Sequence, residues 1–353
     1  MAQQRVIGLD LIRIFAMVLI TGIHFICYSN VRCHVDDIPI CNRLFISFFD
    51  TFAQNWITLF LLISGYFMCQ KNATIDKAIR LWINVIFVSI IVAIPCIVMY
   101  WKNPIGGGNL IQTVFPVLTR NYWYIGGYLL LLLLTPLLNA YSSNASRKSI
   151  LNILITITII YTFLHINKYT TPEYFFGAGT SVFHFAFVYL LGSYLRLYPP
   201  PIGYSKLKLG TTFLITTVAM YTLKLSGAEI VAQWGLLSNT SIIPLVWSVS
   251  LFCIMLDVQI HSDAKWLTTI SSASLTVYLV QENACFREVF WRWIDADNFA
   301  YSPIYIIRWV EAIIILWTIS IVVNKLYDML KKPIFMPIEQ AIVNIIGKIE
   351  III

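Results

Sequence analysis

Charged residues are scarce in this sequence. Asp, Glu, Lys and Arg make up 12% of its 353 residues, about half the share that soluble domains carry. Hydrophobic residues make up 59%, and they gather in runs of about 20, the length that a helix needs to cross the hydrocarbon core of a bilayer. The composition excludes a soluble module large enough to fold alone. It predicts an all-α, polytopic membrane protein.

Several familiar site signatures are also missing. The seven Cys residues are scattered and contain no CxxC pair, so no metal site is expected. Cys33 and Cys41 share one predicted outer loop. They could form a disulfide there or remain isolated thiols. Gly106–Gly108 lack the Gly-Lys-Ser/Thr of a phosphate-binding loop. The Ser64–Gly65 pair lacks the GxSxG setting of a nucleophile, so it is expected to permit close helix packing. The net charge of +7 is spread over short loops, which argues against a nucleic-acid-binding face.

The apolar runs predict about ten transmembrane helices. Their expected bounds are 6–28, 44–69, 81–101, 122–141, 150–166, 180–198, 209–227, 241–259, 267–286 and 304–326. Lys and Arg are more numerous on the segments that face inside when the N-terminus is inside, so the positive-inside rule predicts an N-in, C-in topology. Residues 1–332 are expected to form the transmembrane domain. Residues 333–353, with apolar side chains at mixed spacing and few charges, are expected to lie on the inner interface as an amphipathic helix.

The first span carries three polar side chains on one face. Asp10, Arg13 and His24 fall within a sector of roughly 60°, with Arg13 and His24 about 16 Å apart along the axis. Charges at membrane depth are rare and usually functional. His24 suits general-base work, and Arg13 suits an anionic or carbonyl ligand, with Asp10 orienting it. The structural alternatives are a hydrogen bond from His24 to a neighbouring helix and mutual neutralisation of Asp10 and Arg13.

Four other polar residues lie within predicted spans. Asp50 and Asn55 in the second span could line the path of an acceptor, or could make hydrogen bonds between helices. His184 in the sixth span and Glu311 in the tenth could contact the polar face of the first span, or could form structural pairs elsewhere.

Three stretches of the chain carry motifs of a known family: GLDLIRIFAMVLITGIH (8–24), LFLLISGYFM (59–68) and YWYIGGYLLLLLLTPLLN (122–139). In the first, ten residues separate Arg13 from His24. Together with the basic Lys77 and Arg80 before the third span, these motifs resemble the acyltransferase-3 family of bacterial membrane acyltransferases, in the branch that acetylates surface polysaccharides. The predicted ten spans also match that family.

The resemblance implies transfer of an acetyl or another short acyl group. The donor would be acyl-CoA, usually acetyl-CoA, on the cytoplasmic side of a bacterial inner membrane. The acceptor would be a hydroxyl of a surface-glycan sugar or of a lipid-linked precursor. His24 would be the general base or a transient acyl carrier, and Arg13 would bind the donor or steady a developing oxyanion. Arg80, and more weakly Lys77, would contact the CoA phosphates. A homo-oligomer is left open.

Two positions depart from the family pattern. A His that often follows Tyr-Leu-Ile in a late helix is absent, because 278–282 read YLVQE; there Gln281 could hydrogen-bond, and Glu282 could orient a histidine or contact the acceptor. Tyr122 stands where a His often precedes the Trp of the third motif, and that Trp, Trp123, is expected near the acceptor. The alternative functions are a transporter or flippase of a lipid-linked glycan or small polar solute, with the polar stripe as its path, and a sensor or scaffold.

Overall fold

The computed structural model describes residues 6–29, 31, 37–71, 75–99, 110–166, 179–199, 206–228, 231, 235–258 and 265–350. Within these ranges every regular element is a helix. The helices, in chain order, are α1 (Ile7–Cys27), α2 (Ile40–Phe52), η2 (Ala53–Asn55), α3 (Trp56–Met68), α4 (Ile75–Met99), α5 (Leu110–Val114), α6 (Trp123–Asn144), α7 (Arg147–Ile166), α9 (Val182–Leu197), α10 (Lys206–Ser226), α12 (Ile242–Leu256), α13 (Lys265–Ser272), α14 (Ser274–Gln281), α15 (Ala284–Ile294), α16 (Ala296–Phe299), α17 (Ile304–Leu330), η4 (Lys331–Phe335) and α18 (Met336–Glu350).

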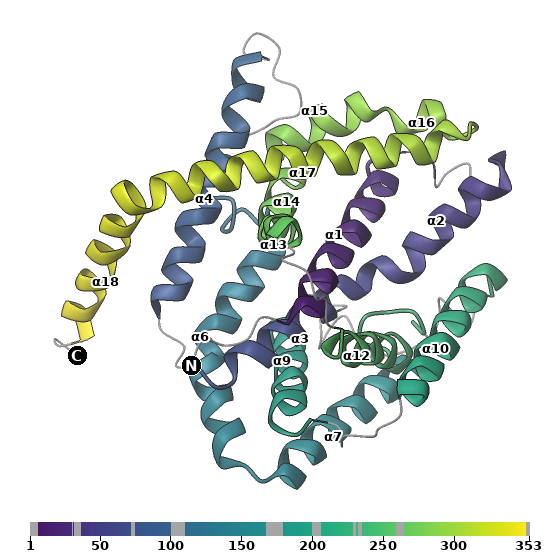
Figure 1. The fold of residues 1–353 in the computed structure, drawn as a ribbon, viewed down its shortest axis with the longest axis horizontal. Coiled ribbons are helices and arrows are strands. Elements are labelled where there is room, and N and C mark those ends of the chain that lie inside the picture. Colours follow the sequence, from purple (N-terminus) through teal and green to yellow (C-terminus); the bar gives the residue numbers. More distant parts are fainter. Residues whose placement is uncertain are drawn as a thin grey trace.

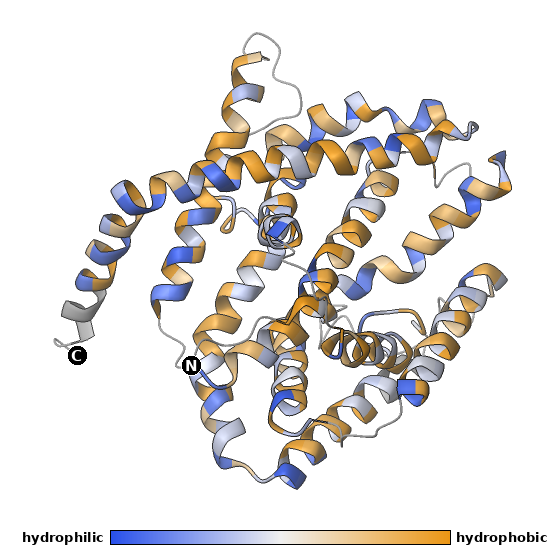
Figure 2. Ribbon diagram, in the orientation of Figure 1, coloured by the Kyte–Doolittle hydropathy of each residue, from blue (hydrophilic) through white to orange (hydrophobic). Residues whose placement is uncertain are grey.

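Five helical stretches of the described residues are long and apolar enough to cross a bilayer. They are Ile7–Cys27, Ile40–Met68, Ile75–Met99, Trp123–Asn144 and Ile304–Ile345. Two shorter helices, α9 and α12, are also apolar, and apolar residues predominate along most of the long helices (Figure 2). The all-α, polytopic prediction is therefore confirmed. The number of spans and the N-in, C-in orientation stay predictions.

The first helix lies near the middle of the molecule (Figure 1). It contacts α2, η2, α3, α12, α13, α14 and α17. Leu9, Ile12 and Leu19 are almost fully buried, and Asp10 and Thr21 are buried with them. Because neighbouring helices surround α1, its polar side chains meet protein groups.

Two glycines bring α3 and α9 into backbone contact. A Cβ on Gly65 would lie 2.0 Å from the carbonyl oxygen of Tyr189, and one on Gly192 would lie 2.4 Å from that of Leu62. Both distances are far inside van der Waals contact, so a larger residue cannot be accommodated at either position without moving a helix. The packing role predicted for the Ser64–Gly65 pair is confirmed.

Two of the predicted spans are divided in the structure. The span expected over 44–69 consists of α2 and α3 with the short η2 between them. The span expected over 267–286 is divided into α13, α14 and the start of α15, with breaks at Ala273 and at 282–283. The breaks fall at short polar stretches, Ala53–Asn55, Ser271–Ser274 and Gln281–Asn283. Hydropathy did not indicate them, because a window of about 20 residues averages each stretch with the apolar residues on both sides.

Asn283 explains the second break. Its side-chain oxygen accepts hydrogen bonds from the backbone N–H groups of Cys285 and Phe286, each at 3.1 Å. This satisfies two amides that the start of α15 leaves without helical partners. The Asn283 amide nitrogen donates to the backbone carbonyl of Ser89 on α4 at 3.0 Å. The cap therefore fixes where α14 ends, and Glu282 lies in the break.

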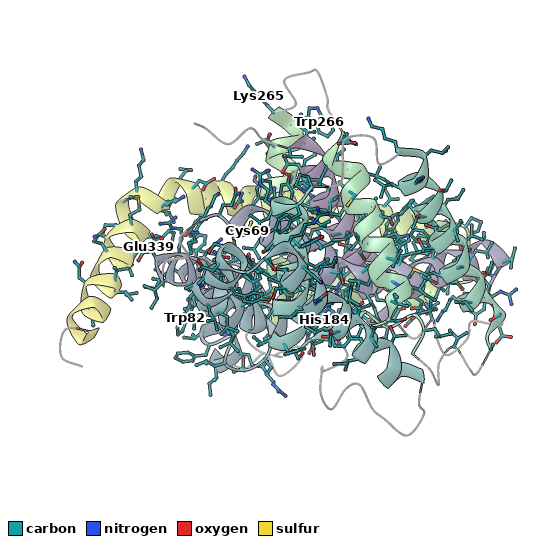
Figure 3. The ribbon with its side chains drawn as sticks, turned by 90° about the horizontal axis from the view of Figure 1, so that it is seen from below. Cys69, Trp82, His184, Lys265, Trp266 and Glu339 are labelled. Carbon is teal, nitrogen blue, oxygen red and sulfur yellow. The ribbon has the colours of Figure 1, made fainter. Side chains whose placement is uncertain are left out.

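The C-terminal segment continues α17 without interruption. After α17, residues Lys331–Phe335 form the π-helix η4. Pro333 lies within η4 and has no backbone N–H to donate to a regular helical turn. The following α18, on which Figure 3 labels Glu339, is tied to α4 by an ion pair. Nε of Arg80 lies 3.2 Å from Oε2 of Glu339. The boundary expected at residue 332 falls within this continuous helical stretch. The interfacial position of 333–353 stays a prediction.

Candidate active site

His24 on α1 meets Glu282 in the break between α14 and α15. The imidazole Nδ1 lies 3.3 Å from Oε1 of Glu282, although the two are not aligned as in a hydrogen bond. Nδ1 is buried, whereas the His24 side chain as a whole keeps 19% exposure. A carboxylate on one ring nitrogen leaves the other nitrogen, Nε2, for a reacting group, as in catalytic carboxylate–histidine pairs.

Two more side chains hold the Glu282 carboxylate. The Tyr28 hydroxyl donates to Oε1 at 2.9 Å, and Nη1 of Arg287 donates to Oε2 at 3.5 Å. The guanidinium also lies over the Tyr28 ring, 5.3 Å from its centroid. Burial, and then the charge of Glu282, raise the pKa of Tyr28 above its ordinary value, so that its hydroxyl stays a neutral donor. We call these four side chains (His24, Tyr28, Glu282 and Arg287) the His24 cluster.

Two hydrogen bonds below the cluster show that α1 runs parallel to α13 and α14. Ser271 Oγ donates to Oδ1 of Asp10 at 3.0 Å, and Thr21 Oγ1 donates to Oε1 of Gln281 at 3.2 Å. Residue numbers increase in the same direction along both segments: Asp10 pairs with Ser271, Thr21 with Gln281, and His24 with Glu282. Parallel direction agrees with the expected order of these segments as first and ninth spans, which cross a membrane the same way.

Arg13 and Asp10 form the ion pair expected from their spacing. Nη1 of Arg13 lies 2.7 Å from Oδ1 of Asp10, and Asp10 is buried whereas the Arg13 side chain keeps 31% exposure. The Asp10 carboxylate is thus shared between Arg13 and Ser271. A guanidinium carries five N–H donors, so this contact orients Arg13 and leaves donors for a ligand.

A cavity of about 200 Å³ adjoins Arg13. Its walls come from α1, α3, α4, α6 and α14, and they are largely aromatic and aliphatic. Along α1 the lining ends at Met17, and along α14 it ends at Tyr278. The hydrogen bond between Thr21 and Gln281 follows one turn later, so this contact lies between the cavity and the His24 cluster.

Four residues proposed for the site or its surroundings have contacts with side chains outside it. Asp50 pairs with a lysine of α10 at 3.3 Å. Asn55 accepts a hydrogen bond from a serine of α12 at 3.3 Å. Glu311 pairs with an arginine of its own helix. His184 is fully buried on α9 (Figure 3), where its ring stacks on a tyrosine of α7 with centroids 5.8 Å apart. For Asp50, Asn55 and Glu311 these contacts are of the kind that the structural alternatives describe. Neither ring nitrogen of His184 has a hydrogen-bond partner among the described residues, and a role of any of the four at the site stays a prediction.

The remaining predicted residues, Lys77, Arg80 and Trp123, do not line the cavity. Lys77 lies one helical turn before Leu81, which lines the cavity. Arg80 instead pairs with Glu339 of α18. The sequence ranked Arg80 above Lys77 for CoA contact, and contact of either residue with CoA stays a prediction. Trp123 packs against Trp56 with ring centroids 5.9 Å apart, so it lies behind a residue of the cavity wall.

Sequence reasoning missed three residues of this region. Tyr28 follows His24 by four positions, so helical spacing could have placed it on the same face. Arg287 lies beyond the helix break, and no periodicity relates it to His24. Tyr128 lines the cavity and its hydroxyl lies 3.0 Å from Oγ of Ser64; its position in the motif at 122–139 was the available signal.

The comparison with known families agrees with the motifs. The model of a family described as an acyltransferase domain matches residues 6–323, which includes α1, the cavity and the His24 cluster. No curated protein and no solved structure gives a significant match to the chain. The matched region covers most of the 353 residues, and the chain therefore belongs to the acyltransferase-3 family of membrane acyltransferases.

Proposed function

We propose that the protein transfers a short acyl group, acetyl by its resemblance, from acyl-CoA to a hydroxyl of a surface-glycan sugar or of a lipid-linked precursor. The observation that carries this proposal is the contact of His24 with Glu282. The helix that holds His24, α1, also presents Arg13 to a cavity. A histidine with a carboxylate on one nitrogen is the usual activator of a hydroxyl nucleophile.

The cavity fits the acyl end of the donor. Its volume of about 200 Å³ is below the roughly 300–1,000 Å³ of pockets that enclose a drug-sized ligand, so it suits the acyl thioester and part of the pantetheine arm, with the nucleotide outside. Arg13 supplies N–H donors to an amide of the pantetheine arm, which remains in the cavity when the thioester reaches His24. Lys77, one turn beyond the lining, supplies positive charge for the phosphates.

In the reaction, Nε2 of His24 takes the proton of the acceptor hydroxyl. The hydroxyl oxygen then forms a bond to the thioester carbonyl carbon, the carbon–sulfur bond breaks, and the CoA thiolate leaves with the proton from His24. In the acyl-carrier variant, Nε2 attacks the thioester carbonyl carbon, the carbon–sulfur bond breaks and CoA leaves as the thiolate. The acceptor hydroxyl then attacks the carbonyl carbon of the acyl-imidazolium, the carbon–nitrogen bond breaks, and the hydroxyl proton passes to the CoA thiolate. In both, the Glu282 carboxylate stabilises the positive charge that develops on the ring.

Access to His24 requires a local rearrangement. The hydrogen bond between Thr21 and Gln281 lies between the cavity and the cluster, so the acyl group must displace it to reach Nε2. One neutral hydrogen bond contributes only about 0.5–1.5 kcal/mol. Donor binding can therefore open this layer, and a Gln281→Ala variant is expected to hydrolyse acetyl-CoA faster in the absence of acceptor.

The test of the function uses purified protein in nanodiscs. His24→Ala should abolish the slow release of free CoA thiol from acetyl-CoA and keep acetyl-CoA binding, whereas Arg147→Gln, an exposed change on α7, should alter neither. NMR of the host's surface glycan, with and without the gene, should show the acyl group disappear. Failure of the wild-type protein to bind or consume acetyl-CoA would support the transporter alternative.

A further inference from the structure

A second pocket lies on the other side of the His24 cluster from the cavity. Its volume is about 450 Å³. Tyr28 and Ser29 at the end of α1 form one part of its wall. The rest, which includes Arg287 of the cluster, comes from α15, Asp295 and the start of α16. The Tyr28 hydroxyl binds Glu282 while Tyr28 also borders this pocket. A ligand in the pocket therefore lies next to the residues that surround His24.

The charges in this pocket do not suit a phosphate. Three carboxylates, of Glu288, Asp295 and Asp297, line it together with two guanidinium groups, of Arg287 and Arg292. The Arg287 guanidinium is already bound to the buried Glu282. A phosphate needs an excess of donors and positive charge. Closely spaced acceptors and donors instead match a ligand whose hydroxyl groups both donate and accept hydrogen bonds.

Trp291 gives independent evidence of a polar ligand. It lines the pocket, is only 6% exposed, and its indole N–H has no hydrogen-bond partner among the described residues. Its ring stacks on Tyr28 with centroids 5.9 Å apart and an interplanar angle of 25°. Buried donors are nearly always paired, so this N–H needs an acceptor beyond the described residues, and a ligand in the pocket that Trp291 lines can supply one.

We propose that this pocket, which we call the outer pocket, holds the acceptor as an uncharged sugar ring. The indole N–H of Trp291 donates to a ring or hydroxyl oxygen, Arg292 donates to a second oxygen, and Glu288 accepts from a hydroxyl. The hydroxyl to be acylated is the one next to Tyr28, on the side of His24. This assignment rests on the proposed function and adds the place and the chemistry of the acceptor, which is distinct from the predicted acceptor path at Asp50 and Asn55.

The test measures sugar binding directly. Saturation-transfer NMR on the full-length protein in nanodiscs would use methyl glucoside, methyl galactoside and methyl N-acetylglucosaminide as neutral probes. Methyl glucuronide and inorganic phosphate would be the anionic probes. The variants are Trp291→Phe, Glu288→Gln and Arg292→Gln, with Arg147→Gln on α7 as the matched arginine control. Loss of one hydrogen bond, to the indole N–H or to a charged side chain, should raise the dissociation constant of a neutral glycoside about tenfold.

The expected result is that the wild-type protein and Arg147→Gln bind at least one neutral glycoside equally, and that the three pocket variants bind it about tenfold more weakly. The proposal is overturned if no neutral glycoside binds, if the pocket variants bind as the wild type does, or if phosphate or the glucuronide binds more tightly. Acetyl-CoA binding is measured in the same samples. Glycoside binding that depends on the pocket, without any acetyl-CoA binding, would refute the proposed function and leave the sugar site in place.

Discussion

Replacing Glu282 by Gln is the most direct test of the His24 cluster. The substitution keeps the size of the side chain and an oxygen that can accept from Tyr28, and it removes the negative charge 3.3 Å from Nδ1 of His24. The proposed chemistry needs that charge only while a proton is on the ring. We therefore expect the Glu282→Gln variant to bind acetyl-CoA normally and to react slowly.

The size of the effect follows from the distance. Two full charges 3.3 Å apart interact by about 5 kcal/mol at an effective dielectric constant of about 20. A proton half transferred in the transition state would be stabilised by about half of that, or about 2–3 kcal/mol, which corresponds to a fall of about 30- to 150-fold in kcat. Imperfect orientation of the imidazole adds to this loss.

The assay compares kcat and KM for acetyl-CoA in nanodiscs. Its controls are the Arg147→Gln variant and the melting temperature of each protein, because Arg287 loses its partner in Glu282→Gln. Arg287 is partly exposed, so water can solvate it and the fold should persist. A kcat within threefold of the wild-type value, or a rise in KM with kcat unchanged, would refute the idea that Glu282 acts through His24.

Three more predictions concern the donor side and the packing. Arg13→Lys keeps the charge and loses the planar fork, so KM for acetyl-CoA should rise about tenfold with a smaller change in kcat; an unchanged KM would exclude donor contact. Lys77→Gln should weaken acetyl-CoA binding and flatten its salt dependence more than Arg80→Gln does, and titrations at two salt concentrations would show the opposite order if Arg80 contacts the phosphates. Gly65→Ala places a Cβ 2.0 Å from a backbone oxygen of α9, so it should destabilise the fold by about 1–3 kcal/mol, seen as a lower melting temperature in detergent; an unaltered melting temperature would contradict the close packing of α3 on α9.

The class of fold and half of the candidate site could be predicted from the sequence. The length of the apolar runs indicates membrane helices because a bilayer sets that length. The regular 100° step of a helix places Asp10, Arg13 and His24 on one face without any knowledge of neighbours. Both inferences depend on local geometry. The structure contains long apolar helices, and Asp10 and His24 of α1 contact residues of the same neighbouring segment, α13 to Glu282.

The remaining half depends on contacts between distant segments. Arg80 looked available for phosphates, and its partner Glu339 lies 259 positions away in the chain. Asp50 and Asn55 looked like pocket residues, and each has a partner on a helix far along the sequence. The cavity beside Arg13 is lined by five helices, and the outer pocket is formed where the end of α1 meets α15 and α16. Hydropathy and periodicity describe one segment at a time, so they do not reveal such pairings.

Glu282 shows why one residue was foreseen as a candidate and its role was not. The absence of a histidine in YLVQE drew attention to the position, and an unbroken helix there would point successive side chains 100° apart. The Asn283 cap instead ends α14 at Gln281, so Gln281 and Glu282 both face α1, one reaching Thr21 and the other the His24 cluster. A continuous helix would separate these two contacts around its surface. Since Asn283 also donates to the backbone of α4, the same residue anchors the break in place, and Asn283→Ala is expected to lower activity through Glu282 although Asn283 itself has no contact with His24.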